Sequence, residues 1–130
     1  MTALLSRLAA AALTVAAFTV APAFAADGPP FTAAQAAHGS QLYSADCASC
    51  HGAHLEGVMG PSLLRGKIPD PGSVKDIYAF LSQSMPLNAP GSLSPADYAA
   101  IMAFLLKQNG HVPGTTALTP AIAKSSTAAY

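Results

Sequence analysis

The sequence predicts a small all-α domain. Three segments combine a helix N-cap signal with apolar residues at helical spacing, and glycine and proline separate these segments from one another. No segment shows the alternation of apolar and polar residues that is typical of a half-buried strand, and no internal repeat occurs. The 130 residues therefore predict one domain of three main helices joined by irregular loops.

The N-terminal 25 residues have the pattern of an export signal. Arg7 precedes an apolar run over residues 8–20, and Ala23-Phe24-Ala25 matches the small-residue motif at which signal peptides are cleaved. An uncleaved membrane anchor is the alternative, but the run is shorter than the roughly 20 apolar residues that a spanning helix prefers. We expect residues 1–25 to be removed near Ala25/Ala26, which leaves a periplasmic protein without stable membrane insertion.

The remaining chain of about 105 residues is nearly neutral. Loss of Arg7 leaves five Lys and Arg residues against six Asp and Glu residues, a net charge of −1. A nucleic-acid-binding protein would need a basic patch, so no nucleic-acid partner is expected. A chain of this size without tryptophan builds only a modest core, and a bound apolar group would add to it.

The first predicted helix follows an extended leader over residues 26–31. Thr32-Ala33-Ala34-Gln35 fits a capping box, and the helix is expected to reach about Ser44. Gly39 lies inside it, one turn before Tyr43. Because an internal glycine costs about 1 kcal/mol relative to alanine, it indicates the close approach of another helix. We expect His38 to be solvated or partly buried rather than a ligand.

The two cysteines of the chain lie in Cys47-Ala48-Ser49-Cys50-His51, a C-x-x-C-H pattern. Two thiols at this spacing can form thioether bonds to the two vinyl groups of one haem. The histidine that follows is then held under the iron as the proximal ligand. The motif therefore predicts one covalently bound haem c, with Cys47 and Cys50 as attachment sites and His51 as an iron ligand.

Three other interpretations of the motif are less consistent with its surroundings. A redox-active disulfide is expected in a strand–helix setting, and no strand pattern precedes Cys47. A structural disulfide across three residues would close a very small loop and stabilise little. A zinc site would need a second ligand pair, which the remaining histidines do not form: His38, His54 and His111.

The chain after His51 is irregular until Ser73, because glycine and proline recur through residues 52–72. Ser73 is predicted to cap a second helix that reaches about Gln83. Its expected buried face comprises Ile77, Phe80 and Leu81.

The third helix is predicted to begin at Pro95, after the N-cap Ser94, and to run to about Gln108 before Asn109-Gly110 ends it. Residues 112–130, rich in Thr, Ala, Pro and Ser, are expected to be a loosely packed tail. The apolar stripe of the third helix comprises Tyr98, Ile101, Met102 and Leu105.

Met85 is the predicted distal iron ligand. An electron-transfer haem needs a sixth ligand from the side opposite His51, and Met85 lies in a loop between two helices, followed by Pro86. Met59 and His54 follow His51 too closely to reach the far side, and Met102 lies within an apolar stripe where core methionine is usual. His111 and an open coordination position are the alternatives to Met85.

These residues together resemble class I cytochrome c over residues 33–110. The matching motifs are Gly39-x-x-x-Tyr43, Cys47-Ala48-Ser49-Cys50-His51-Gly52, Gly60-Pro61-x-Leu63, Ser84-Met85-Pro86 and the helix over 98–105. The resemblance implies a cytochrome domain over 32–111, with loops wrapped around one haem. It also implies that the first and last helices cross at Gly39, with Tyr98 or Phe104 as the contact partner of this glycine.

The same resemblance implies roles for two loop residues. The carbonyl of Pro61 would accept a hydrogen bond from the second nitrogen of the His51 imidazole, which fixes the ring and raises its basicity. Arg65 is a candidate contact for a haem propionate, and an exposed surface arginine is the alternative.

A soluble one-electron carrier is the main functional hypothesis. The segment from Met85 to Ser94, together with Asn109-Gly110, is similar to cytochromes that accompany periplasmic quinoprotein dehydrogenases. That similarity implies such a dehydrogenase as donor and a terminal oxidase or another cytochrome as acceptor. The alternatives are an obligatory cytochrome subunit of a dehydrogenase complex and an open-site haem protein, either a peroxidase or a gas-binding protein.

Overall fold

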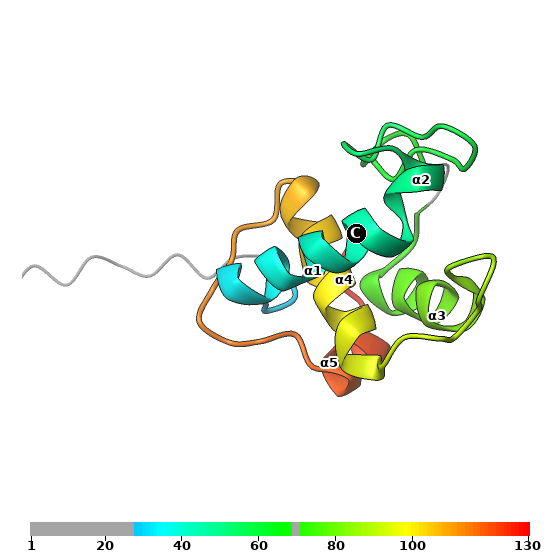
Figure 1. Cartoon of the computed structure of the whole chain (residues 1–130). Coiled ribbons are helices and arrows are strands. Elements are labelled where there is room, and N and C mark those ends of the chain that lie inside the picture. The colour runs from blue at the N-terminus through cyan, green and yellow to red at the C-terminus, as the bar shows by residue number, and fades with distance from the viewer. Residues whose placement is uncertain (1–27, 69–70) are drawn as a thin grey trace, which may run out of the picture.

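The computed structural model describes residues 28–68 and 71–130, and the predicted signal peptide and its cleavage site lie outside them. Five helices occur in these residues: α1 (Ala33–Asp46), α2 (Ala48–His51), α3 (Val74–Ser84), α4 (Pro95–Gln108) and α5 (Pro120–Ser125) (Figure 1). The described residues contain two isolated β-bridges and no strand. The predicted all-α fold is confirmed. None of the described helices is long and apolar enough to cross a membrane.

Helix α4 forms the centre of the core. Residues 98–106 are all buried, so the helix is covered on every side and not only along the predicted stripe. The reason is that α1 crosses one side of α4 while α3 and α5 pack on others (Figure 1). Ser94 caps the helix by accepting a hydrogen bond from the amide of Asp97, 3.1 Å away, and Asn109 ends it.

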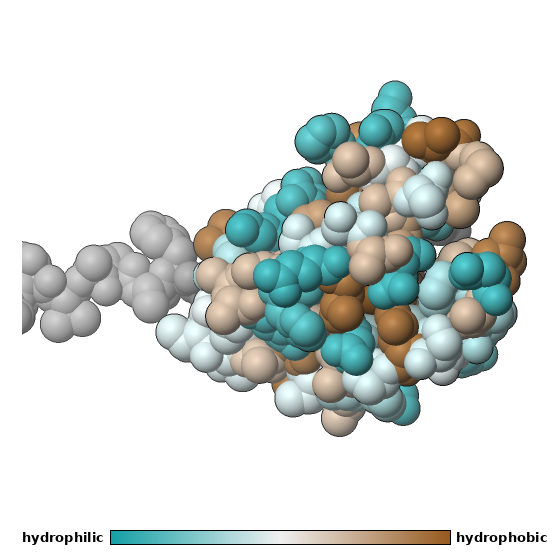
Figure 2. Space-filling model, viewed as in Figure 1, coloured by the Kyte–Doolittle hydropathy of each residue, from teal (hydrophilic) through white to brown (hydrophobic). Residues whose placement is uncertain are grey.

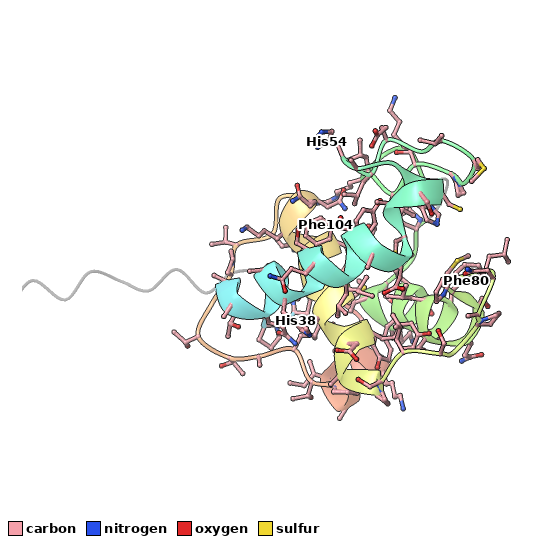
Figure 3. The ribbon with its side chains drawn as sticks, in the orientation of Figure 1. His38, His54, Phe80 and Phe104 are labelled. Atoms are coloured by element: carbon pink, nitrogen blue, oxygen red, sulfur yellow. The ribbon has the colours of Figure 1, made fainter. Side chains whose placement is uncertain are left out.

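Gly39 lies where α1 crosses α4. A Cβ atom at this position would collide with the backbone carbonyl of Ala100. The contact partner of Gly39 is therefore the α4 backbone, and the expectation of Tyr98 or Phe104 as that partner is wrong. Phe104 instead packs against Tyr43, with ring centroids 5.1 Å apart (Figure 3). Only glycine allows the two helix backbones to approach this closely.

The predicted capping box at Thr32 is half correct. The Thr32 hydroxyl accepts a hydrogen bond from the amide of Gln35 at 3.1 Å. The Gln35 side chain does not return to Thr32; its amide group donates to the carbonyl of Leu118 at 2.7 Å and accepts from the Leu118 amide at 2.8 Å. Gln35 therefore joins α1 to a segment more than 80 residues away in sequence.

Residues 112–130 pack against the domain, which corrects the expectation of a loose tail. They include the short helix α5, and Leu118, Ala123 and Tyr130 are each at most 1% exposed. The backbone of this segment also pairs with α3, because the carbonyls of Ser126 and Ala128 accept hydrogen bonds of 3.0 and 2.9 Å from its first turn. The segment thus supplies apolar side chains that complete a small core.

Helix α3 begins as predicted, with the Asp76 carboxylate accepting a hydrogen bond of 3.0 Å from the amide of Ser73. Its predicted buried face is partly wrong. Leu81 is buried and Ile77 is half-buried, but Phe80 is 61% exposed. The buried positions are Val74, Tyr78 and Leu81, which face α4 and α5, whereas Phe80 extends from the other side of the helix.

Candidate functional site

The Cys47–His51 motif forms a single helical turn, α2, directly after α1. Cys47 is both the C-cap residue of α1 and the N-cap residue of α2. Its carbonyl accepts hydrogen bonds from the amides of Cys50 (3.1 Å) and His51 (3.0 Å). This turn places the two thiols close in space, with Cys47 buried and Cys50 half-buried. The motif therefore lies at the edge of the core, where a group attached to both thiols would lie against apolar side chains.

The two cysteine thiols are free in the structure. Burial, together with the neighbouring negative charge of Asp46, raises the pKa of Cys47 to about 11. A redox-active cysteine needs the opposite shift, because the thiolate is the reactive form. The surroundings of Cys47 thus disfavour a thioredoxin-like role for the motif.

The His51 imidazole is held by the loop that follows it. Its Nδ1 lies 2.8 Å from the carbonyl oxygen of Pro61. Because a carbonyl oxygen only accepts, Nδ1 carries the proton, and Nε2 has the free lone pair that a metal would take. The expected contact between Pro61 and the ring is therefore present, and Gly60 lies under the ring, where a Cβ would be only 2.9 Å from Cε1.

The carbonyl oxygen of Cys50 stabilises the loop that follows His51. This oxygen accepts hydrogen bonds from three successive amides, those of Val58 (3.1 Å), Met59 (3.1 Å) and Gly60 (2.9 Å). The Tyr43 hydroxyl donates to the carbonyl of Gly52 at 2.7 Å, and burial raises the pKa of this phenol to about 12. The tyrosine therefore remains a neutral donor, which fixes the chain immediately after His51.

Met85 lies at the C-terminal end of α3, as its C-cap residue, and is half-buried against the core. Its peptide bond to Pro86 is cis. The Met85 carbonyl accepts a hydrogen bond of 2.6 Å from the Tyr98 hydroxyl on α4, and its amide donates to Leu81 at 3.2 Å. The backbone at Met85 is thus fixed by both α3 and α4.

The elements that carry His51 and Met85 flank a hollow in the surface. Helix α2 and the 53–66 loop lie on one side of it and α3 on the other (Figures 1 and 2). Several apolar side chains pack against the core but are not fully covered: Leu63, Leu64, Ile68, Ile77, Met85 and Leu93. Incompletely covered apolar side chains, the free Nε2 of His51 and the two free thiols are the features that a flat, apolar, thioether-linked group such as haem would need.

The remaining histidines lie elsewhere. His54 points outward from the loop after α2, and His38 lies on α1, where its Nε2 is 3.2 Å from the Asp97 carboxylate (Figure 3). His111 follows the C-terminal end of α4 and packs on Gly28. Tyr98, whose hydroxyl donates to the Met85 carbonyl, lies near the N-terminal end of the same helix.

Arg65 lies away from Met85 as well. It is exposed and lines a cavity of about 340 Å³ together with His111 and five other residues. Its backbone amide donates to the side chain of Asn109. Sequence patterns predicted that Asn109 ends a helix but did not reveal its contacts with Leu63 and Arg65, because these residues are more than 40 positions away in sequence.

Comparisons with known proteins agree with this geometry. Residues 34–105 match the family model described as cytochrome c oxidase, cbb3-type, subunit III. Among solved structures, the chain is similar to the sulfane dehydrogenase SoxCD from Paracoccus pantotrophus, with 32% sequence identity and a TM-score of 0.58. The match covers 71% of this chain and 52% of the SoxCD chain, so this chain spans about half the length of that one. No curated protein matches.

Proposed function

The chain belongs to the cytochrome c family represented by the cbb3-type oxidase subunit III model, and on that premise we propose that it is a periplasmic one-electron carrier with His51 and Met85 as iron ligands. Membership of the family makes it a class I c-type cytochrome, an electron-transfer protein with haem c as its cofactor. The observation that carries the proposed ligation is the hydrogen bond from His51 Nδ1 to Pro61, which leaves Nε2 for the metal.

When bound, the haem supplies a one-electron couple between ferric and ferrous iron. Cys47 and Cys50 hold the group through thioether bonds and do not themselves change oxidation state. His51 provides the proximal nitrogen and Pro61 orients its ring. Met85 provides the distal sulfur from a backbone that Tyr98 holds in place. Arg65, which is exposed at the end of the 61–65 loop, is the proposed propionate partner.

The apolar residues around the hollow have two functions in this proposal. They would pack against the bound haem and exclude water from it, which favours transfer of an electron without a change of ligands. Several apolar side chains of the elements on either side of the hollow are exposed, including Val58 and Met59 on the loop after α2, Phe80 on α3 and Leu87 in the loop that follows α3. One edge of the group would therefore lie close to the molecular surface.

The proposed compartment is the periplasm. The support is the signal-peptide pattern of residues 1–25, with Arg7 before an apolar run and Ala23-Phe24-Ala25 at its end. Haem is attached to C-x-x-C-H thiols outside the cytoplasm in bacteria, so export agrees with the motif.

The proposed electron donor is a periplasmic dehydrogenase. The similarity to SoxCD, which is a sulfane dehydrogenase, supports a partner of this general class, and a quinoprotein dehydrogenase is the narrower hypothesis from the sequence. A terminal oxidase or another cytochrome is the proposed acceptor, which the name of the matching family supports. The SoxCD match also favours a second candidate, a cytochrome subunit that works only within a dehydrogenase complex. Co-purification with a dehydrogenase would distinguish the two.

Replacement of the distal ligand tests this proposal. In a Met85→Ala variant the haem is expected to lose its low-spin six-coordinate spectrum and to have a lower midpoint potential, because methionine ligation raises the potential. The reduced variant is also expected to bind carbon monoxide rapidly, because no side chain then occupies the sixth coordination position. The measurement is an optical redox titration. Met59→Ala is the matched control, since Met59 is 79% exposed, and it should leave the spectrum unchanged. A low-spin spectrum that survives in Met85→Ala would refute the assignment.

A further inference from the structure

Tyr130 lies in the core beside the loop that follows Pro61. The residue is 1% exposed, and its hydroxyl donates a hydrogen bond of 2.9 Å to the carbonyl of Leu63. The side-chain amide of Asn109 donates to the Tyr130 oxygen at 3.0 Å and to the same Leu63 carbonyl at 3.1 Å. Two residues that are far from Leu63 in sequence therefore hold one loop carbonyl.

Further hydrogen bonds fix residues 62–65 of this loop. The Leu63 amide and the Ser62 hydroxyl both donate to the carbonyl of Leu55 at 2.8 Å, and the Arg65 amide donates to Asn109 Oδ1. Residues 62–65 are thus fixed between the turn at Leu55 and the end of α4. Pro61 directly precedes them, so the position of its carbonyl depends on how firmly they are held.

Tyr130 is positioned independently of that loop. The segment before it is bound to α3, since the Val74 amide donates to the Ala128 carbonyl at 2.9 Å and the Lys75 amide donates to Ser126 at 3.0 Å. Burial raises the pKa of the Tyr130 phenol, so that it stays a neutral donor. Tyr130 is therefore a fixed point against which the loop can be aligned.

We propose that Tyr130, acting with Asn109, is a positioning residue for His51. The two side chains hold Leu63 and Arg65, these hold the Pro61 carbonyl, and the carbonyl orients the imidazole through Nδ1. This inference rests on the proposed ligation of the iron by His51. Tyr130 lies outside the residues that match the family model.

The expected direction of the effect follows from the chemistry of the imidazole. A hydrogen bond from Nδ1 to a carbonyl makes the ring a stronger donor to the metal, and a stronger donor favours ferric iron. If the loop loosens, this hydrogen bond weakens and the midpoint potential rises. The loop amides then also exchange their hydrogens faster.

The test compares Tyr130→Phe with Gln35→Met in the haem-loaded protein. Tyr130→Phe keeps the buried ring and removes the hydroxyl that donates to Leu63. Gln35→Met removes two hydrogen bonds to Leu118, in the same 112–130 segment but away from the 61–65 loop. The readouts are the midpoint potential and amide hydrogen exchange at Arg65 and Leu118, measured by nuclear magnetic resonance.

Tyr130→Phe is expected to raise the midpoint potential and to speed exchange at Arg65 about fivefold or more, because each of the two hydrogen bonds lost, to Leu63 and from Asn109, contributes about that factor. Gln35→Met should speed exchange at Leu118 and leave both the potential and the Arg65 amide unchanged. Equal potentials in Tyr130→Phe and the native protein would overturn the positioning role, as would an equal shift in Gln35→Met. A native protein with high-spin ferric haem would contradict the proposed ligation instead, and that spectrum is recorded first.

Discussion

A Cys47→Ala, Cys50→Ala double variant is expected to lose all covalently attached haem. The two thiols are the only cysteines of the chain, and α2 places them within one helical turn. Without them no thioether bond can form, and the uncovered apolar surface around the hollow loses the group that would cover it. The measurement is intact mass together with haem staining after electrophoresis under denaturing conditions.

Ser49→Ala is the control for the cysteine variants. Ser49 lies between the two thiols and is exposed, so its replacement keeps the turn and both attachment sites. The Ser49→Ala protein should carry one haem that survives denaturation. Covalent haem in the double variant, or its absence in Ser49→Ala, would show that attachment does not occur through these thiols.

Gly39→Ala is expected to destabilise the protein by about 3 kcal/mol or more, the upper part of the range for overpacking a core. In an isolated helix the same substitution would stabilise by about 1 kcal/mol. Here the added Cβ would collide with the Ala100 carbonyl, and a backbone atom of a buried helix cannot move aside without separating α1 from α4. The steric term is therefore the larger one. Denaturant unfolding of the haem-loaded protein measures the difference.

Gly114→Ala is the control for the helix crossing. A Cβ at Gly114 would meet no atom within 4 Å, and this glycine does not require a positive φ. Its replacement should leave the free energy of unfolding nearly unchanged. If Gly39→Ala proved as stable as Gly114→Ala, the close approach of α1 and α4 would not be a feature of the folded protein.

The sequence predicted three of the five helices of the described residues because their ends carry local signals. Thr32, Ser73 and Ser94 each occur directly before a helix of the structure, and Asn109 ends α4. Helix α5 carries the same type of signal, with Thr119 as N-cap and Pro120 at the first helical position. Its polar, Pro-rich surroundings led to the expectation of a loose tail, and the burial of Tyr130 is a long-range property that no local pattern contains.

In the candidate site, as in the fold, the local features were predicted from the sequence and the long-range contacts were not. The motif around His51 and the Gly60-Pro61 turn are local, and the structure places the Pro61 carbonyl against the ring as the resemblance implied. The hydrogen bonds that join Asn109 and Tyr130 to Leu63 span 46 and 67 residues, and nothing in the spacing of these residues indicates them. The exposure of Phe80 has the same origin, since only the packing of α3 on α4 and α5 decides which side of α3 is buried.

The most direct test of the proposed iron centre is a potentiometric titration of the native protein followed by its optical spectrum. His51 and Met85 ligation predicts a single one-electron transition, low-spin haem in both oxidation states, and a sulfur-to-iron band that is present in the ferric protein. A high-spin ferric spectrum with water bound to the iron would contradict this ligation.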